Sequence, residues 1–242
     1  MSLTLHSEQP GLSVAFEPGS GAQGSLTSAP ELSKLPIVQQ IVEKLGGPLL
    51  ELCRRARRVG PVDAGAIVLL AGCHDGVGCS TVALACAAAA SVEWPTALVD
   101  VSLSDSKVGG PSLTQLLVGQ ATAGWEDVVS GAAPMDEAVL YLDTREALAF
   151  FPKSESQRLG LRTAEFSPAD FAGWLGQMRH EYGLVFIDGG SMDGSAAQWA
   201  PWVDAALVVC DPKKTSAADW TDAWDRLEER GAHVLGIVET FV

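Results

Sequence analysis

The residues best suited to chemistry in this sequence form a short glycine-rich stretch. Residues 72–81 read GCHDGVGCST and separate an apolar run from an alanine-rich helical stretch. Glycines let the backbone curl so that successive N–H groups point at phosphate oxygens, and the start of the next helix adds a favourable dipole. A hydroxyl at that helix start is suited to hold Mg²⁺. The stretch predicts a phosphate-binding loop, with a glycine turn that binds nothing as the alternative. The residues expected to contact nucleotide are Gly76, Val77, Gly78, Cys79, Ser80 and Thr81.

The stretch lacks one component that phosphoryl transfer requires. Cys79 stands where a lysine would contact the terminal phosphates of a nucleotide and neutralise their charge. Asp75 adds a negative charge where phosphates would lie, and His74 could offer a cation but, as a lone loop histidine, is expected to be solvated. Because charge stabilisation dominates transfer, transfer should suffer more than binding. We therefore expect ATP or ADP with Mg²⁺ to bind weakly, and neither to be essential.

The elements that must position this loop follow an alternating pattern. Short apolar runs without polar alternation predict strands covered on both faces, and helical stretches separate them. This order predicts a doubly wound, mostly parallel α/β sheet with helices on both faces. Upstream, the pattern from Pro36 onward is helical, and Gly46, Gly47 and Pro48 are expected to divide it into two helices. The predicted strands are 66–71, 96–100, 184–188, 205–210 and 234–238, and the predicted helices are 80–92, 167–182 and 216–230.

Length and composition set the limits of these predictions. The chain has 242 residues, which suits one α/β domain at 31–242 after a flexible tail at 1–30, in which residues 12–16 could dock as a short strand. The net charge of −14 argues against a nucleic-acid partner. No signal-peptide pattern opens the chain and no apolar run could span a bilayer, so we expect a cytoplasmic protein without direct membrane insertion. Five cysteines without a C-x-x-C pair or a histidine cluster give no reason to predict zinc.

Several motifs, taken in order, resemble those of one family. Residues 76–81 are similar to the Walker A loop of the bacterial tyrosine kinases (BY-kinases) of capsule and exopolysaccharide synthesis, and of the MinD/ParA group. Residues 97–103 resemble the kinases' second Walker motif, which ends in Asp-x-Asp-Leu-Arg. Asp100 is kept there, but Ser102 and Ser104 replace the second aspartate and the arginine. Residues 182–190 resemble the Walker B strand, with Asp188 kept and the usual Thr-Pro-Pro lost.

The resemblance covers roughly residues 48–240 and implies a P-loop NTPase-like fold. It also implies that Ser80, Asp100 and Asp188 would hold Mg²⁺, and that the two aspartates would be catalytic if the site were active.

A charged pattern precedes the first predicted strand. Glu51, Arg54 and Arg57 are spaced E-x-x-R-x-x-R, so a helix would place them on one side. In the BY-kinases this pattern joins neighbouring subunits into a ring, and the resemblance implies the same use here. The alternative is a solvated basic helix end, where cations suit the helix dipole.

The departures from the family pattern together indicate loss of catalysis. Cys79 and Ser102 remove groups that handle phosphate or metal, and the two tyrosines of the chain, Tyr141 and Tyr182, do not form a tyrosine-rich tail. We predict a catalytically impaired BY-kinase-like regulator or scaffold of exopolysaccharide or capsule synthesis or export. Its expected partners are its own copies and an inner-membrane export protein that would recruit it. The alternatives are an ATPase or kinase, fully or weakly active, that uses another cation such as Lys213, and a MinD/ParA-like positioning protein.

Overall fold

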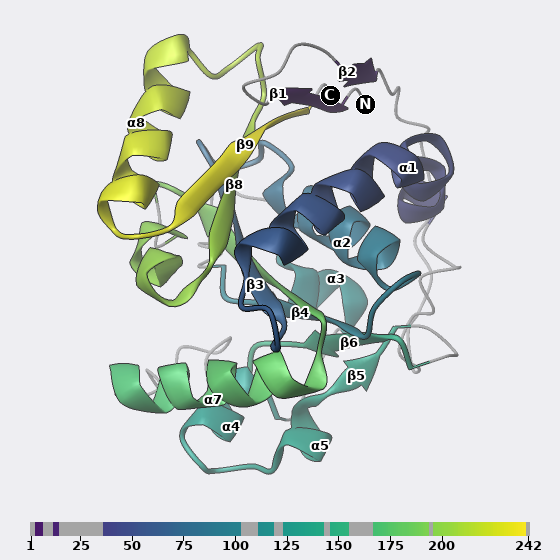
Figure 1. Ribbon diagram of the computed structural model, residues 1–242, viewed down its shortest axis with the longest axis vertical. Coiled ribbons are helices and arrows are strands. Elements are labelled where there is room, and N and C mark those ends of the chain that lie inside the picture. Colours follow the sequence, from purple (N-terminus) through teal and green to yellow (C-terminus); the bar gives the residue numbers. More distant parts are fainter. Residues whose placement is uncertain are drawn as a thin grey trace.

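The computed structural model describes residues 3–6, 12–14, 36–102, 111–118, 123–142, 146–154, 167–193 and 196–240. Within these ranges nine strands form one sheet in the order β2-β1-β9-β8-β3-β7-β4-β6-β5 (Figure 1). The strands from β9 to β6 in this order run parallel, and β5, β1 and β2 pair antiparallel with their neighbours. The bounds are β1 (Leu3–His6), β2 (Leu12–Val14), β3 (Ala66–Gly72), β4 (Thr96–Asp100), β5 (Leu140–Tyr141), β6 (Leu148–Phe151), β7 (Leu184–Ser191), β8 (Ala205–Cys210) and β9 (His233–Thr240).

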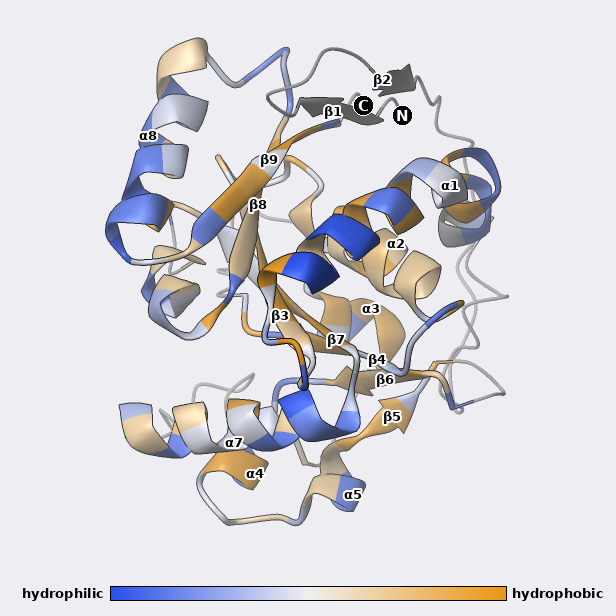
Figure 2. Cartoon of the chain, viewed as in Figure 1, coloured by the Kyte–Doolittle hydropathy of each residue, from blue (hydrophilic) through white to orange (hydrophobic). Residues whose placement is uncertain are grey.

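Helices cover both faces of this sheet. One hydrophobic cluster joins the strands to α1, α2 and α3, and a second joins them to α4, α7, α8 and the 3₁₀ helix η2. The predicted α/β architecture is therefore confirmed. Figure 2 shows apolar central strands, with hydrophilic residues on the outward sides of α1 and α8. The bounds are α1 (Pro36–Val59), α2 (Cys79–Ala90), α3 (Leu113–Leu117), α4 (Trp125–Val129), α5 (Met135–Ala138), α7 (Pro168–Glu181), η2 (Ala196–Trp202) and α8 (Ala217–Glu229).

Strand β3 shows why its sequence is apolar without alternation. Val68 and Leu70 belong to the cluster under α1 and α2, while Ile67 and Leu69 belong to the cluster on the opposite face. Successive side chains of a strand point to opposite faces, so a strand covered on both faces must be apolar at every position. The run that predicted this strand thus reflects its central place in the sheet.

The predicted break of the first helix is wrong, because α1 continues through Pro48. Leu45, Leu49 and Leu52 lie on either side of the proline and are buried against the helix and strands beneath α1. Most helix stability in proteins comes from packing of the apolar face, which here offsets the hydrogen bond that proline cannot donate.

Two further groups of strands extend the sheet. The sequence pattern predicts no strand between residues 101 and 183, but β5 and β6 lie there, and the four residues of β6 are fully buried. At the other edge, β1 pairs with β9 and β2 pairs with β1. The remaining residues of the expected tail lie outside the described part of the chain. No helix in the described ranges is long and apolar enough to cross a bilayer.

Candidate functional site

The predicted site residues meet where parallel strands end. The glycine loop follows β3, and Asp188 lies in the neighbouring strand β7. Asp100 is the last residue of β4 and is the register partner of Asp188. Ligands of such sheets bind outside the carboxyl ends of the strands, so the topology brings the loop and both carboxylates to the expected edge.

The loop has the backbone conformation that its glycines allow. Gly76 and Gly78 have φ angles of 75° and 90°, in the left-handed region, where side chains are strained. Helix α2 then begins at Cys79, and the N–H of Val82 donates to the carbonyl of Gly78 at 3.0 Å. A cavity of about 210 Å³ opens above the loop. Its lining comprises His74, Asp75, Gly76, Val77, Gly78, Cys79, Ser80, Thr81, Ser102, Pro111, Ser112, Leu116, Gly190 and Ser191.

No lysine or arginine is among the described residues that line this cavity. His74, which also lines the cavity, lies 3.3 Å from Asp193 and 3.5 Å from Asp219. Its side chain is 35% exposed, so it is partly solvated, as expected for a loop histidine, and it also lies beside two carboxylates. Lys214 contacts Asp211 at 3.4 Å, and neither it nor Lys213 lines the cavity.

Cys79 occupies the lysine position as a buried, neutral group. Its exposed fraction is 7%. Burial, reinforced by the nearby charge of Asp188, raises the pKa of the Cys79 thiol well above its usual range. The thiol thus remains protonated at neutral pH, and this position supplies no positive charge to the cavity.

Asp188 is fully buried, and its two oxygens differ in their described partners. Its Oδ1 accepts the N–H of Gly190 at 3.2 Å. Burial raises the pKa of Asp188 to about 6, and the charge of Asp100 adds to the rise. The side chains of Ser80 and Cys79 partly offset it. Among the described residues, none gives Oδ2 a hydrogen bond of normal geometry. Within the described ranges, Oδ2 of Asp188 is therefore an acceptor of the site without such a bond.

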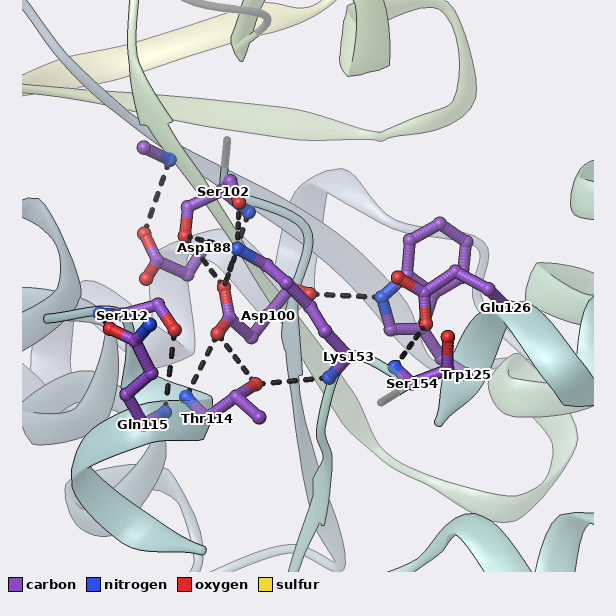
Figure 3. Close-up of polar contacts among 11 residues, drawn as sticks. Asp100, Ser102, Ser112, Thr114, Gln115, Trp125, Glu126, Lys153, Ser154 and Asp188 are labelled. Atoms are coloured by element: carbon purple, nitrogen blue, oxygen red, sulfur yellow. Dashed lines mark hydrogen bonds and ion pairs between the residues drawn. The ribbon is translucent and has the colours of Figure 1, made fainter. Parts of the chain in front are cut away.

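Asp100, in contrast, is fully paired (Figure 3). Its Oδ1 accepts the N–H of Ser102 at 3.2 Å and the hydroxyl of Ser102 at 2.7 Å. Its Oδ2 accepts the N–H of Thr114 at 2.9 Å and the Thr114 hydroxyl at 2.7 Å. Ser102, which stands where the family has an aspartate, is thus a hydrogen-bond partner of the aspartate that remains.

Lys153 completes this network and was not predicted from the sequence. It follows β6, the strand beside β4. Its Nζ lies 3.5 Å from Asp100 Oδ1, donates to the Ser102 hydroxyl at 3.1 Å and also donates to the Ser102 carbonyl (Figure 3). The apolar run at Leu148–Phe151, ending before a proline, was a signal that could have revealed a strand. Its pairing with β4 could not be read from the sequence.

Helix α4 makes hydrogen bonds to Asp100 and to the segment that carries Lys153. The indole Nε1 of Trp125 donates to the carbonyl of Asp100 at 2.9 Å, and the Trp125 N–H donates to the carbonyl of Pro152 at 3.0 Å. Glu126 accepts the N–H of Ser154 at 2.8 Å. Burial raises the pKa of Glu126 to about 7, although that hydrogen bond opposes the rise.

Three tryptophans are buried, and the other four are half-buried. Trp125, Trp174 and Trp199 are buried, and the ring of Trp125 lies 6.0 Å from that of Trp174 and 5.8 Å from that of Trp199. Trp199 and Trp202 share η2 with ring centres 6.0 Å apart. These buried rings pack in the hydrophobic core on the α4 and α7 side of the sheet.

The expected interface residues lie on the exposed side of α1. Arg54 forms a two-bond ion pair with Glu93 of its own chain and lies 3.5 Å from Glu51. Arg57 donates to the carbonyl of Pro61 at 3.1 Å. The three residues therefore share one helix surface, as their spacing predicts.

The residues present do not suit a magnesium ion at Asp100. Mg²⁺ needs carboxylate oxygens that can enter its octahedral shell. Both oxygens of Asp100 already accept hydrogen bonds, and an ammonium group lies beside one of them. Ser80 and Asp188 keep an oxygen environment nearby, but the described residues hold no group of three histidine, cysteine or acidic side chains that could bind a metal.

Comparison with known proteins identifies the fold. No protein-family model matches the sequence, and no curated protein sequence matches it. Among solved structures, the kinase domain of VpsO is similar with a TM-score of 0.67 at 19% identity, covering 87% of this chain and 97% of that one. The kinase domain of the Escherichia coli tyrosine kinase ETK gives a TM-score of 0.66 at 14% identity, covering 91% and 83%. This chain has the P-loop NTPase fold.

A plasmid partition protein from Borrelia burgdorferi, bound to AMPPNP, has a TM-score of 0.54 at 14% identity and covers 73% of this chain and 75% of its own. Tyrosine-kinase domains and partition ATPases are thus both structural neighbours, as the motifs predicted. At these identities the likeness establishes the fold alone.

Proposed function

We propose that this chain is a catalytically impaired, BY-kinase-like P-loop protein that acts as a regulator or scaffold. The observation that carries the proposal is the neutral Cys79 thiol at the lysine position, in a cavity whose described lining has no lysine or arginine. Removing one group that stabilises transition-state charge typically slows a reaction about 10²–10³-fold. Here Ser102 also replaces the family's second aspartate and pairs with Asp100.

The cofactor proposal is weakened nucleotide binding. The curled loop and the start of α2 still offer N–H groups to a phosphate. The cavity of about 210 Å³ is smaller than the roughly 300–1,000 Å³ of common small-molecule sites. Asp75 on its lining repels anions, and so does Asp188, which has a pKa of about 6 and is mostly ionised at neutral pH. Because no described lysine or arginine lines the cavity, the described residues would hold a phosphate through backbone dipoles.

Turnover assays with Mg²⁺ and ATP test the loss of catalysis. We expect the wild-type protein to release no phosphate above background and to gain no phosphotyrosine. The Ser80→Ala variant serves as the control, because activity from a contaminating enzyme would persist in it. Hydrolysis or phosphotyrosine that disappears in Ser80→Ala would refute the proposal and favour an ATPase or kinase that uses another cation.

The partner proposal is self-association together with recruitment by an inner-membrane protein of polysaccharide export. It is supported by the motif resemblance to BY-kinases and by the exposed Glu51 and Arg54 and the half-buried Arg57 on α1. Because Arg54 already pairs with Glu93, a neighbouring subunit would have to compete with that contact.

Light scattering tests the self-association. The wild-type protein should have a mass above that of one chain, and Glu51→Ala combined with Arg54→Ala should reduce it. Glu229→Ala, on the exposed side of α8, is the matched control and should change nothing. A monomer in every sample would contradict assembly through α1. Assembly that requires ATP would favour the MinD/ParA-like alternative.

A further inference from the structure

Lys153 is a buried cation that the proposed function does not use. Its exposed fraction is 9%, and it follows β6 beside Asp100, which the motif resemblance implies would hold Mg²⁺. Its Nζ faces three oxygens: the Asp100 carboxylate at 3.5 Å, the Ser102 hydroxyl at 3.1 Å and the Ser102 carbonyl. Carboxylate, hydroxyl and carbonyl oxygens are also the ligands that hard divalent cations take in proteins.

The backbone around Lys153 fixes the direction of this side chain. The N–H of Lys153 donates to the Thr114 hydroxyl at 2.9 Å, and the same hydroxyl donates to Asp100. The next N–H, that of Ser154, donates to Glu126 at 2.8 Å, and the preceding carbonyl accepts from Trp125 at 3.0 Å. Residues 152–154 are thus hydrogen-bonded to α3 and α4, and these bonds fix the backbone that carries the lysine (Figure 3).

The lysine and a metal ion compete for the same oxygens. A carboxylate has about four acceptor sites, and those of Asp100 are filled by Ser102 and Thr114. A divalent cation would have to displace these donors and would also be repelled by the ammonium group. The ammonium donates two hydrogen bonds to Ser102, and its charge faces Asp100 Oδ1 as an ion pair at 3.5 Å.

We propose that the Lys153 ammonium takes the place of the divalent cation at Asp100, so that the folded chain neutralises this carboxylate without a metal. This proposal does not depend on whether the chain transfers phosphate. Metal binding tests the role of Lys153, and ATP turnover tests the proposed loss of catalysis. The wild-type site should therefore exclude hard divalent cations. Removing the ammonium should allow one to bind.

Titration with Mn²⁺, followed by the electron paramagnetic resonance signal of the free ion, tests this role in the full chain without nucleotide. Wild type should take up no Mn²⁺ through Asp100. Lys153→Met keeps the length of the side chain and removes its charge, so it should gain a single site at least about tenfold tighter than any in wild type. Adding Asp100→Asn to that variant should abolish the gain.

Lys214→Met is the matched control, because it removes a lysine that contacts a different buried carboxylate, Asp211, at 3.4 Å. It should gain no site. A lysine that served only as a structural ion pair would also leave Lys153→Met without a gain, which would overturn the proposal.

The wild-type titration keeps the test decisive if Lys153→Met and the second variant, Lys153→Gln, both fail to fold by circular dichroism. Mn²⁺ bound by wild type and lost in Asp100→Asn would overturn the proposal, and wild type without such a site would support it. ATP turnover is measured in parallel, so that failure of the proposed function is recognised by its own readout.

Discussion

Replacing Glu126 with glutamine should stabilise the protein above about pH 7 and have little effect near pH 4.5. Glu126 is 4% exposed, and burial raises its pKa from 4.5 to about 7. Its one described partner is the N–H of Ser154 at 2.8 Å, which a glutamine oxygen can accept equally well. The substitution therefore removes the ionisable proton while keeping the contact.

The sign and size follow from proton linkage. The folded state binds this proton more tightly than the unfolded state, so the contribution of Glu126 to stability is fully present below pH 4.5 and is lost as the pH rises through about 7. A rise of about 2.5 units corresponds to about 3 kcal/mol at 1.36 kcal/mol per unit. Asp188, with a pKa of about 6, titrates in an overlapping range. It is present in both proteins and cancels in the comparison.

Urea unfolding at several pH values measures the effect. The free energy of unfolding of Glu126→Gln minus that of wild type should grow by about 2.5 kcal/mol between about pH 5 and pH 8. Glu43→Gln, at an exposed position of α1, is the matched control and should show no such growth. A difference that stays constant with pH, or that shrinks as the pH rises, would refute the buried-carboxyl reasoning.

Three further substitutions probe the same corner and the first helix. Thr114→Val removes the hydroxyl between Asp100 and Lys153 and should lower the free energy of unfolding by about 2–4 kcal/mol, because buried polar groups lose partners; an unchanged urea midpoint would contradict this. Trp125→Phe removes the indole donor to the Asp100 carbonyl and should cost about 1–3 kcal/mol, with circular dichroism showing the fold retained; wild-type stability would mean that the bond contributes nothing. Pro48→Ala restores a helical N–H inside α1, so it should raise the free energy of unfolding by about 1–3 kcal/mol and raise the thermal midpoint. A lower midpoint would show that the proline is preferred there.

Much of the frame of this protein follows from local features of the sequence. The runs at 96–100 and 205–210 match β4 and β8 to the residue. A strand that is apolar at every position can bury its side chains only between two covering layers, and a short apolar run favours a strand. The glycine loop was equally readable, because left-handed positions such as Gly76 and Gly78 are encoded by residue type.

The first helix shows where local reasoning fails. Proline is a strong local signal to end a helix, but the apolar face of α1 is buried along its length on both sides of Pro48. Packing energy is summed over many side chains, whereas the proline affects one turn. The sequence contains both the apolar face and the proline, and only the packed tertiary structure shows which has the larger effect on α1.

The chemistry of the site was determined by contacts between distant parts of the chain. From the sequence, Cys79 could be identified as a missing lysine, and Asp100 and Asp188 as the remaining acids. The sequence could not show that Lys153, 51 residues beyond Ser102, lies against it. That contact exists because β6 pairs beside β4, and strand pairing depends on the whole sheet rather than on either segment. Residue types and spacing thus determined the fold and the loop, while the tertiary arrangement decided which carboxylate is neutralised and which, Asp188, has an oxygen that no described residue pairs.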